Sequence, residues 1–247
     1  MKLADKQDLP ALSALWELCF GDPPAVIQSF FDRLWNDIQV FTTKDHTAML
    51  TAMPVRWQDK DAAYLYAVAT HPDHRGQGLC RKLMDFAEEY LREQGCSYTT
   101  LHPAEASLYQ FYRELGYETT FFCGSQSFHV KHPMAVTAVN PTDYAALRKK
   151  FCENSVEYPT CLLALQAHYG ALVQISDIGC AALERTETGW TVRELLASDP
   201  ERAGQALCAY LDTDSLSVRL PGAEPFAMAK SLDGSPLIPS WLGLAFE

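Results

Sequence analysis

The sequence contains no Cys-x-x-Cys pair and no close group of cysteine and histidine residues, although it has eight cysteines. Zinc sites usually draw their ligands from such groups, so no metal is expected, and the scattered cysteines indicate free thiols in a reducing compartment. The chain also lacks an apolar run of about 18 residues and an apolar core near its N-terminus. These absences predict a cytoplasmic protein with no membrane segment and no signal peptide.

Basic residues are scarce: 20 lysines and arginines stand against 31 acidic residues, which gives a net charge of −11. Neither half of the chain has an excess of positive charge, so a surface that binds nucleic-acid phosphates is not expected. The hydrophobic share of 48% and the charged share of 21% are typical of a globular protein. A length of 247 residues allows one large domain or two small ones. Nothing in the sequence indicates an oligomeric state.

The first half alternates helical and extended patterns, which indicates a mixed α/β fold. Asp8 and Pro10 predict the start of a first helix, and Gly21 predicts its end. The clearest helix covers residues 79–94, where apolar side chains recur on one face. The other expected elements are a helix from Pro23 to about 34, strands near 38–43, 47–57, 62–70 and 97–102, a helix near 106–115, and strands up to about 131.

The composition changes at Lys131-His132-Pro133, which predicts two domains, residues 1–132 and 133–247. The second part is expected to contain helices near 142–151, 160–169 and 200–211, a hairpin that turns at about 186–189, and a strand near 215–220. Its segment SDPERAGQALCAYL is similar to HPDHRGQGLCRKLMDF in the first part. Because both segments follow an apolar strand and open a helix, we interpret the second part as a weak repeat of the first.

The segment Arg75-Gly-Gln-Gly-Leu-Cys80 joins an apolar strand to the clearest helix. Glycines allow consecutive backbone N–H groups to point into one concavity, and the helix N-terminus adds partial positive charge. Arg75 adds a charged donor, so the segment predicts a pyrophosphate site. The spacing matches neither a GxGxxG fingerprint nor a GxxxxGK[ST] loop, which disfavours a Rossmann fold and a P-loop NTPase. The alternative is a plain strand-to-helix turn.

This segment resembles the GNAT superfamily of acetyl-CoA-dependent N-acetyltransferases. Arg75 and Gly78 match its signature Arg/Gln-x-x-Gly-x-Gly/Ala, and Cys80 stands where the family usually has glycine or alanine. The preceding segment VATHP resembles the end of the family strand whose backbone holds the pantetheine arm and the thioester carbonyl. The resemblance implies acetyl-CoA as cofactor, bound by Val68, Thr70, Arg75, Gly76, Gln77, Gly78, Leu79 and Cys80.

A second segment, SLYQFYRELGY at residues 107–117, resembles the family element in which a tyrosine lies close to the cofactor sulfur. The resemblance implies that the substrate amine attacks the thioester directly and that Tyr112 protonates the departing thiolate as general acid. The alternative for Tyr112 is a core tyrosine with a satisfied hydroxyl, and Tyr109 is expected to be a packing residue. The general base is less defined. His102, which ends a strand at a position that can face the cleft, is the first candidate, and the others are His71, His74, Tyr64, Tyr66 and Asp61.

The second part resembles a degenerate GNAT unit, as in tandem-GNAT proteins of the enhanced-intracellular-survival type without their third domain. Ala203 and Ala206 replace both glycines of the first turn, and alanine is disfavoured at positive φ, so only one cofactor site per chain is expected. The resemblance also raises the possibility that Phe246 and the Glu247 carboxylate reach the first active site. The alternative is a C-terminal strand that completes the second sheet.

The sequence therefore predicts an α/β (α+β) protein with a GNAT-like mixed sheet flanked by helices, followed by a second, degenerate unit. The implied function is acetyl transfer to a primary amine of a small molecule or a peptide. Two alternatives are a non-catalytic acyl-CoA-binding sensor or pseudoenzyme and a structural or interaction protein. Nothing in the sequence identifies the amine.

Overall fold

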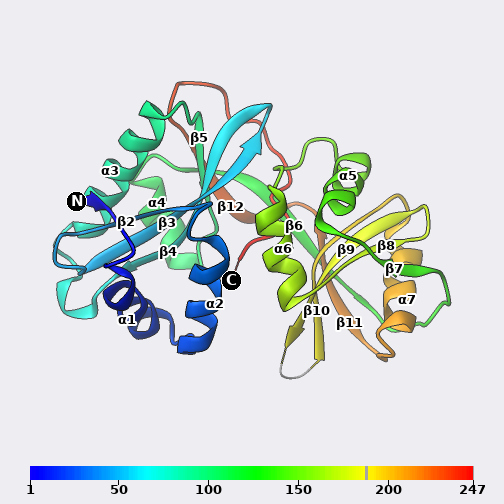
Figure 1. The fold of residues 1–247 in the computed structure, drawn as a ribbon. Helices are drawn as coiled ribbons and strands as arrows, with labels where there is room; N and C mark the ends of the chain where they lie inside the picture. The colour runs from blue at the N-terminus through cyan, green and yellow to red at the C-terminus, as the bar shows by residue number, and fades with distance from the viewer. Residues whose placement is uncertain (187–188, 247) are drawn as a thin grey trace. The chain divides into compact units, whose positions relative to one another are not determined.

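The computed structural model describes residues 1–186 and 189–246, and these residues form two compact units (Figure 1). Unit 1 holds Met1–Glu118 together with Met228–Leu237. Unit 2 holds Thr119–Ala227 and the described residues from Ile238 on. Each unit has a mixed sheet flanked by helices, which confirms the predicted fold class. The chain passes from one unit to the other after Glu118, after Ala227 and after Leu237, and the predicted boundary at 132/133 lies within unit 2.

Unit 1 contains a sheet with the strand order β1-β2-β3-β4-β5-β12. The neighbouring strands pair antiparallel except β4 and β5, which are parallel. Its elements are β1 (Lys2–Leu3), α1 (Leu9–Phe20), α2 (Pro24–Leu34), β2 (Gln39–Thr42), β3 (Ala48–Trp57), β4 (Lys60–Thr70), a 3-10 turn (Pro72–His74), α3 (Leu79–Glu93), β5 (Tyr98–Leu101), α4 (Ala106–Arg113) and, within β12 (Glu224–Ser231), Met228–Ser231.

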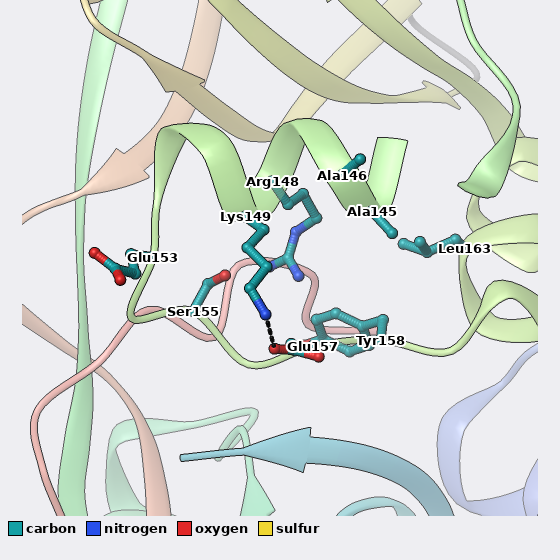
Figure 2. Close-up of a pocket in the computed structure, with 9 residues that line it drawn as sticks. All are labelled: Ala145, Ala146, Arg148, Lys149, Glu153, Ser155, Glu157, Tyr158 and Leu163. Carbon is teal, nitrogen blue, oxygen red and sulfur yellow. Dashed lines mark hydrogen bonds and ion pairs between the residues drawn. The ribbon is translucent and has the colours of Figure 1, made fainter. Parts of the chain in front are cut away.

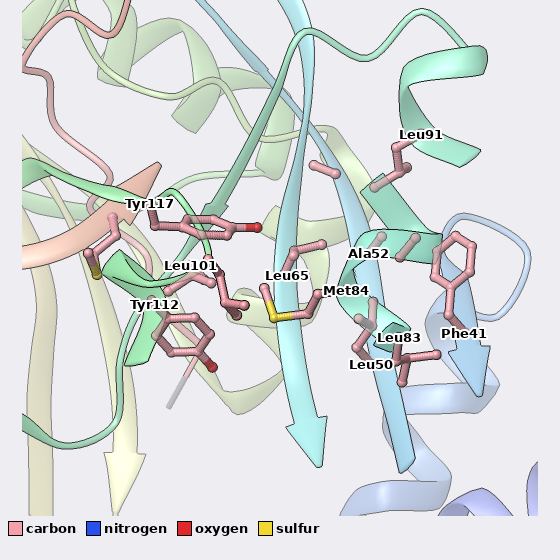
Figure 3. Close-up of a cluster of buried hydrophobic side chains, with 14 of the residues drawn as sticks. Phe41, Leu50, Ala52, Leu65, Leu83, Met84, Leu91, Leu101, Tyr112 and Tyr117 are labelled. Carbon is pink, nitrogen blue, oxygen red and sulfur yellow. The ribbon is translucent and has the colours of Figure 1, made fainter. Parts of the chain in front are cut away.

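Helices cover both faces of this sheet. On one face, α3 places Leu83 and Met84 against β3 and β4 in a buried cluster (Figure 3). On the other face, Trp16 of α1 and Phe30 of α2 surround the ring of Tyr66, with centroids 5.4 and 5.7 Å from it. The aromatic stripe of the first two helices is thus core packing, as the helical spacing predicts.

Asp8 stands at the start of α1 but does not cap it with its side chain. Its carboxylate instead accepts hydrogen bonds from Lys2 Nζ at 2.6 Å and from the backbone N–H of Asp5 at 2.9 Å, and it lies 2.7 Å from His46 Nε2. These bonds, that of Lys2 first, hold the pKa of Asp8 well below its usual range. The residue therefore ties β1 to the β2–β3 turn rather than serving as the helix cap that the sequence predicts.

Strand β12 comes from the far end of the chain and completes the sheet of unit 1 beside β5 (Figure 1). Its Met228 lies opposite Leu101, and Ser231 lies opposite Tyr98. A buried polar network fixes it to α3: Lys230 Nζ donates to Glu88 Oε2 at 2.5 Å, and the Tyr117 hydroxyl donates to Glu88 Oε1 at 2.7 Å.

Unit 2 contains a sheet with the strand order β6-β11-β10-β9-β8-β7, in which only the β10–β11 pair is parallel among the described pairings. The predicted hairpin is β9–β10, and part of its turn, residues 187–188, lies outside the described residues. The elements are β6 (Glu118–Phe128), β7 (Val136–Ala138), α5 (Pro141–Phe151), α6 (Thr160–Tyr169), β8 (Gly170–Ile175), β9 (Gly179–Thr186), β10 (Gly189–Ala197), α7 (Pro200–Tyr210) and β11 (Leu216–Pro221).

The segment of unit 2 that is similar to the glycine turn does not form a turn. Only Ser198 and Asp199 separate β10 from α7, whereas residues 71–78 separate β4 from α3. Ala203 and Ala206 lie inside α7 and are buried in the core of unit 2. The pattern of strand, helix and parallel strand repeats, but the loop between strand and helix does not.

The C-terminal segment forms no regular strand in the sheet of unit 2 as far as Phe246, where the description ends. It makes isolated bridges from Ser240 to Phe121 and from Trp241 to Ser155. The ring of Phe246 lies 6.3 Å from that of Tyr158, also in unit 2. The predicted role of Glu247 lies outside the described residues.

Replacing Lys230 by methionine is expected to destabilise the protein by about 1–3 kcal/mol, because Glu88 is then a buried charge without its cation. Urea unfolding monitored by circular dichroism measures the change. Glu89→Gln is the matched control, because Glu89 lies on the same helix in an exposed pair with Arg92 and should cost less than about 0.5 kcal/mol. Equal losses in both variants would contradict a specific role for the Lys230–Glu88 pair.

Candidate functional site

Strands β4 and β5 separate at the centre of unit 1. Their parallel pairing joins Ala62–Tyr64 to Tyr98–Thr100 and ends there, although β4 continues to Thr70. A bulge between β3 and β4 lies just beyond, where Ala67 adopts a φ of +49°. Bulges re-aim side chains and end pairing, and non-glycine residues at positive φ are strained. The carboxyl half of β4 therefore has an edge that β5 does not cover.

The glycine turn follows this edge. Gly76 and Gly78 have φ values of +75° and +71°, which only glycine adopts easily. A Cβ built on either would meet no atom within 4 Å, so there is open space above the turn. Gly78 is also the N-cap of α3, and no side chain caps the first turn of this helix. Uncapped N–H groups at the start of a helix attract an anion.

The side chains of Arg75 and Gln77 stabilise the turn by hydrogen bonds to backbone carbonyls. The Arg75 Nε–H donates to the Thr70 carbonyl at 3.2 Å, which closes the loop across its base. The Gln77 side-chain amide donates to the Asp73 carbonyl at 3.5 Å. Both side chains are exposed and lie beside the open space, so the turn presents backbone donors and one guanidinium together.

Tyr112 lies in the buried cluster of unit 1, against which Val68, Leu79 and Cys80 pack (Figure 3). Burial, followed by the nearby Cys80, raises the pKa of its phenol well above the usual range. Burial also raises the pKa of the Cys80 thiol to about 11. The structure thus brings together Tyr112, the start of α3 and the end of β4, three segments that the sequence connects only by motif.

His102 directly follows β5 and is half-buried. Leu101 belongs to the cluster that contains Tyr112, so the alternation of a strand would place His102 towards the opposite face. The other candidate bases lie in three places, and one of them, Asp61, is exposed near the start of β4, where it pairs with Arg56. Tyr64 and Tyr66 lie on the α1–α2 side of β4, whereas the rings of His71 and His74, 5.5 Å apart, lie at the start of the turn.

Two features of the site went unrecognised in the sequence. The bulge at Ala67 has no local signature, because alanine is not a residue that positive φ selects. The second feature is the buried network of Lys230, Glu88 and Tyr117. The residues before Lys230, Phe226-Ala-Met228-Ala, alternate large and small apolar side chains, which is a readable strand signal. Within residues 1–186 and 189–246, no group of three acidic, histidine or cysteine side chains is arranged to hold a metal, and no helix is long and apolar enough to cross a membrane.

A separate pocket of about 250 Å³ lies in unit 2, between α5 and the segment that follows it (Figure 2). It is lined by Lys149, Glu157, Tyr158 and their neighbours and contains none of the predicted site residues.

The family model described as "Acetyltransferase (GNAT) domain" matches residues 1–120. Residues 1–120 form a GNAT acetyltransferase domain. A curated acetyltransferase of Pectobacterium atrosepticum is 25% identical over 126 residues, which cover 48% of this chain and 87% of the relative. The match to the family model ends where unit 1 passes into unit 2, and it contains the glycine turn and Tyr112.

Solved structures extend the likeness of fold over both units. A probable N-acyltransferase of Enterococcus faecalis covers 94% of this chain with 72% of its own, at a TM-score of 0.72 and 18% identity. Eis1 of Mycobacterium abscessus covers 94% with 74% of its own, at a TM-score of 0.65 and 14% identity. The GNAT-like fold thus spans nearly the whole chain, as the resemblance to tandem proteins implies.

Gly78→Ala is expected to weaken the binding of an acyl-CoA, with acetyl-CoA as the probe, because alanine at a φ of +71° distorts the start of α3. Isothermal titration calorimetry should show a loss of affinity of about tenfold or more. Gly234→Ala is the matched control, since Gly234 has a φ of +80° and equal open space but lies far from the turn in sequence. If both variants bind the probe as the unaltered protein does, the turn is not the binding site.

Proposed function

We propose that this protein transfers the acetyl group of acetyl-CoA to a primary amine of a small molecule or a peptide. The observation that carries the proposal is that Tyr112 lies close to Cys80, in the buried cluster against which Val68 and Leu79 also pack, beside an uncapped helix start. A phosphate cradle, an unpaired strand edge and a buried acid thereby meet at one end of β4. Family membership supports the reaction class, and the acceptor amine is left open.

The residues fit the cofactor in size and chemistry. The backbone N–H groups of residues 76–80 and the guanidinium of Arg75 suit a pyrophosphate, and the edge of β4 from Val68 to Thr70 suits the amides of a pantetheine arm. When bound, acetyl-CoA supplies an activated acyl thioester. Only unit 1 offers this arrangement among the described residues, so we propose one cofactor site per chain and a degenerate second domain.

The chain's own residues manage two protons. Tyr112 keeps its phenol protonated at neutral pH because burial raises its pKa, so it would hold a proton available for the sulfur of a bound acyl thioester. His102, on the other side of the sheet, accepts the proton of the substrate ammonium.

Tyr112→Phe is expected to lower kcat by about 100-fold with little change in the KM for acetyl-CoA, because the proton donor is lost while the ring still packs. Thiol release with a panel of amines measures the rate. Tyr109→Phe is the matched control, one helical turn away on α4, and should retain full activity. Binding of acetyl-CoA without turnover of any amine would instead support the non-catalytic acyl-CoA-binding function.

The pH dependence of kcat tests the protonation state directly. Because the pKa of Tyr112 is raised, the proton-donating form persists as pH rises, and kcat should not fall between about pH 7 and 10. The rate is measured at saturating amine and cofactor. A decline with an apparent pKa near 10, the usual value of a tyrosine, would remove Tyr112 from this role.

A further inference from the structure

The pocket in unit 2 is lined by residues of α5, of α6 and of the segment between these two helices. This pair precedes β8–β10 as α1–α2 precedes β2–β4. The repeat extends to the bulge: Arg193 interrupts the β9–β10 register as Ala67 does in β3–β4. Unit 2 therefore lacks a glycine turn like that of unit 1, and it has a cavity beside its first two helices.

A buried ion pair forms the rigid back of this pocket. Arg148, 2% exposed, donates from Nε to Glu194 Oε1 at 2.8 Å and from Nη2 to Glu194 Oε2 at 3.0 Å. It also donates to the carbonyls of Val156 and Leu242. Because these partners already occupy the guanidinium, Arg148 shapes the pocket and is not its ligand-binding group.

The front of the pocket is chemically divided (Figure 2). Ala145 and the ring of Tyr158 make an apolar end, with the fully buried Leu163 behind them. Beside it, Lys149 Nζ and Glu157 Oε1 form an ion pair at 3.3 Å, with side chains 65% and 47% exposed. An ion pair this exposed contributes only about 0–1 kcal/mol, so a ligand separates it at little cost.

We propose that this pocket binds a small zwitterion, an α-amino acid with an apolar side chain. Its carboxylate pairs with Lys149, its ammonium pairs with Glu157, and its side chain lies against Ala145 and the ring of Tyr158. A ligand with both charges replaces both partners of the opened ion pair. A simple acid or a simple amine leaves one of them without a counter-charge, which is the basis of the selectivity.

The size of the pocket agrees with this class of ligand. Drug-sized ligands occupy pockets of about 300–1,000 Å³, and 250 Å³ suits a metabolite of about nine heavy atoms such as leucine. The site does not depend on acetyl transfer, since it contains no residue of the proposed catalytic machinery. Through Arg148, its back wall is joined to the C-terminal segment at Leu242, so occupancy is expected to stabilise unit 2 as well.

The test is isothermal titration calorimetry of the full chain with L-leucine, 4-methylpentanoate and 3-methylbutylamine. The latter two lack the ammonium and the carboxylate respectively. Leucine is expected to bind, and the other two are expected to bind at least about tenfold more weakly. Lys149→Met and Glu157→Gln should each weaken leucine binding by a similar factor, while Lys150→Met, on the same helix but outside the pocket lining, should not.

Three outcomes would overturn the proposal: no heat of binding with leucine up to about 10 mM, equal binding of the acid or the amine, or unchanged affinity in both pocket variants. Circular dichroism of each variant distinguishes a lost site from a lost fold. Titration of the same samples with acetyl-CoA reports on unit 1 separately, so failure of the proposed acetyl transfer and failure of this site give different results.

Discussion

The early end of the pairing between β4 and β5 is the constraint on which the site depends. Beyond Tyr64 and Thr100, the backbone groups on one edge of β4 need partners from outside the sheet. The bulge at Ala67 fixes where this edge begins, and the turn that follows opens directly onto it. Tyr112 packs behind the same place. A single interruption in strand pairing thus sets the positions of the β4 edge, the glycine turn and Tyr112 relative to one another.

Local features of the chain could be predicted from the sequence, and long-range pairings could not. The apolar spacing of residues 79–94 predicts α3, which ends one residue earlier, and Gly21 ends α1 as expected. The position of β12 in unit 1 was missed because strand partners are chosen by tertiary packing rather than by propensity. The segment around Ala203 is similar in sequence to the glycine turn, but it does not form one. The reason is that Pro200 starts helix α7 before this segment. The motifs name the residues of the candidate site, whereas the contacts that β12 makes around it come from a distant part of the chain.

The two units show how one architecture is kept while its chemistry changes. In unit 1 the strand end beyond the bulge faces a turn with open space above two glycines. In unit 2 the residue after the bulge is Glu194, whose carboxylate is occupied by Arg148, Trp241 and Tyr144. A buried charge with three donors is a rigid structural element, and removing any one donor would leave it undercompensated. Where unit 1 has an open glycine turn, unit 2 thus has an internal ion pair.

The placement of β12 has a consequence for how the chain is made. Strand β5 is paired on one side by β4, which precedes it closely, and on the other by Met228–Ser231, which is synthesised more than a hundred residues later. The edge of β5 in unit 1 therefore stays open until Met228–Ser231 has been synthesised. Contacts of such large sequence separation slow folding and leave a strand edge exposed to other chains. Unit 1 therefore begins to form before unit 2 is synthesised but is completed only after nearly all of unit 2 has been made.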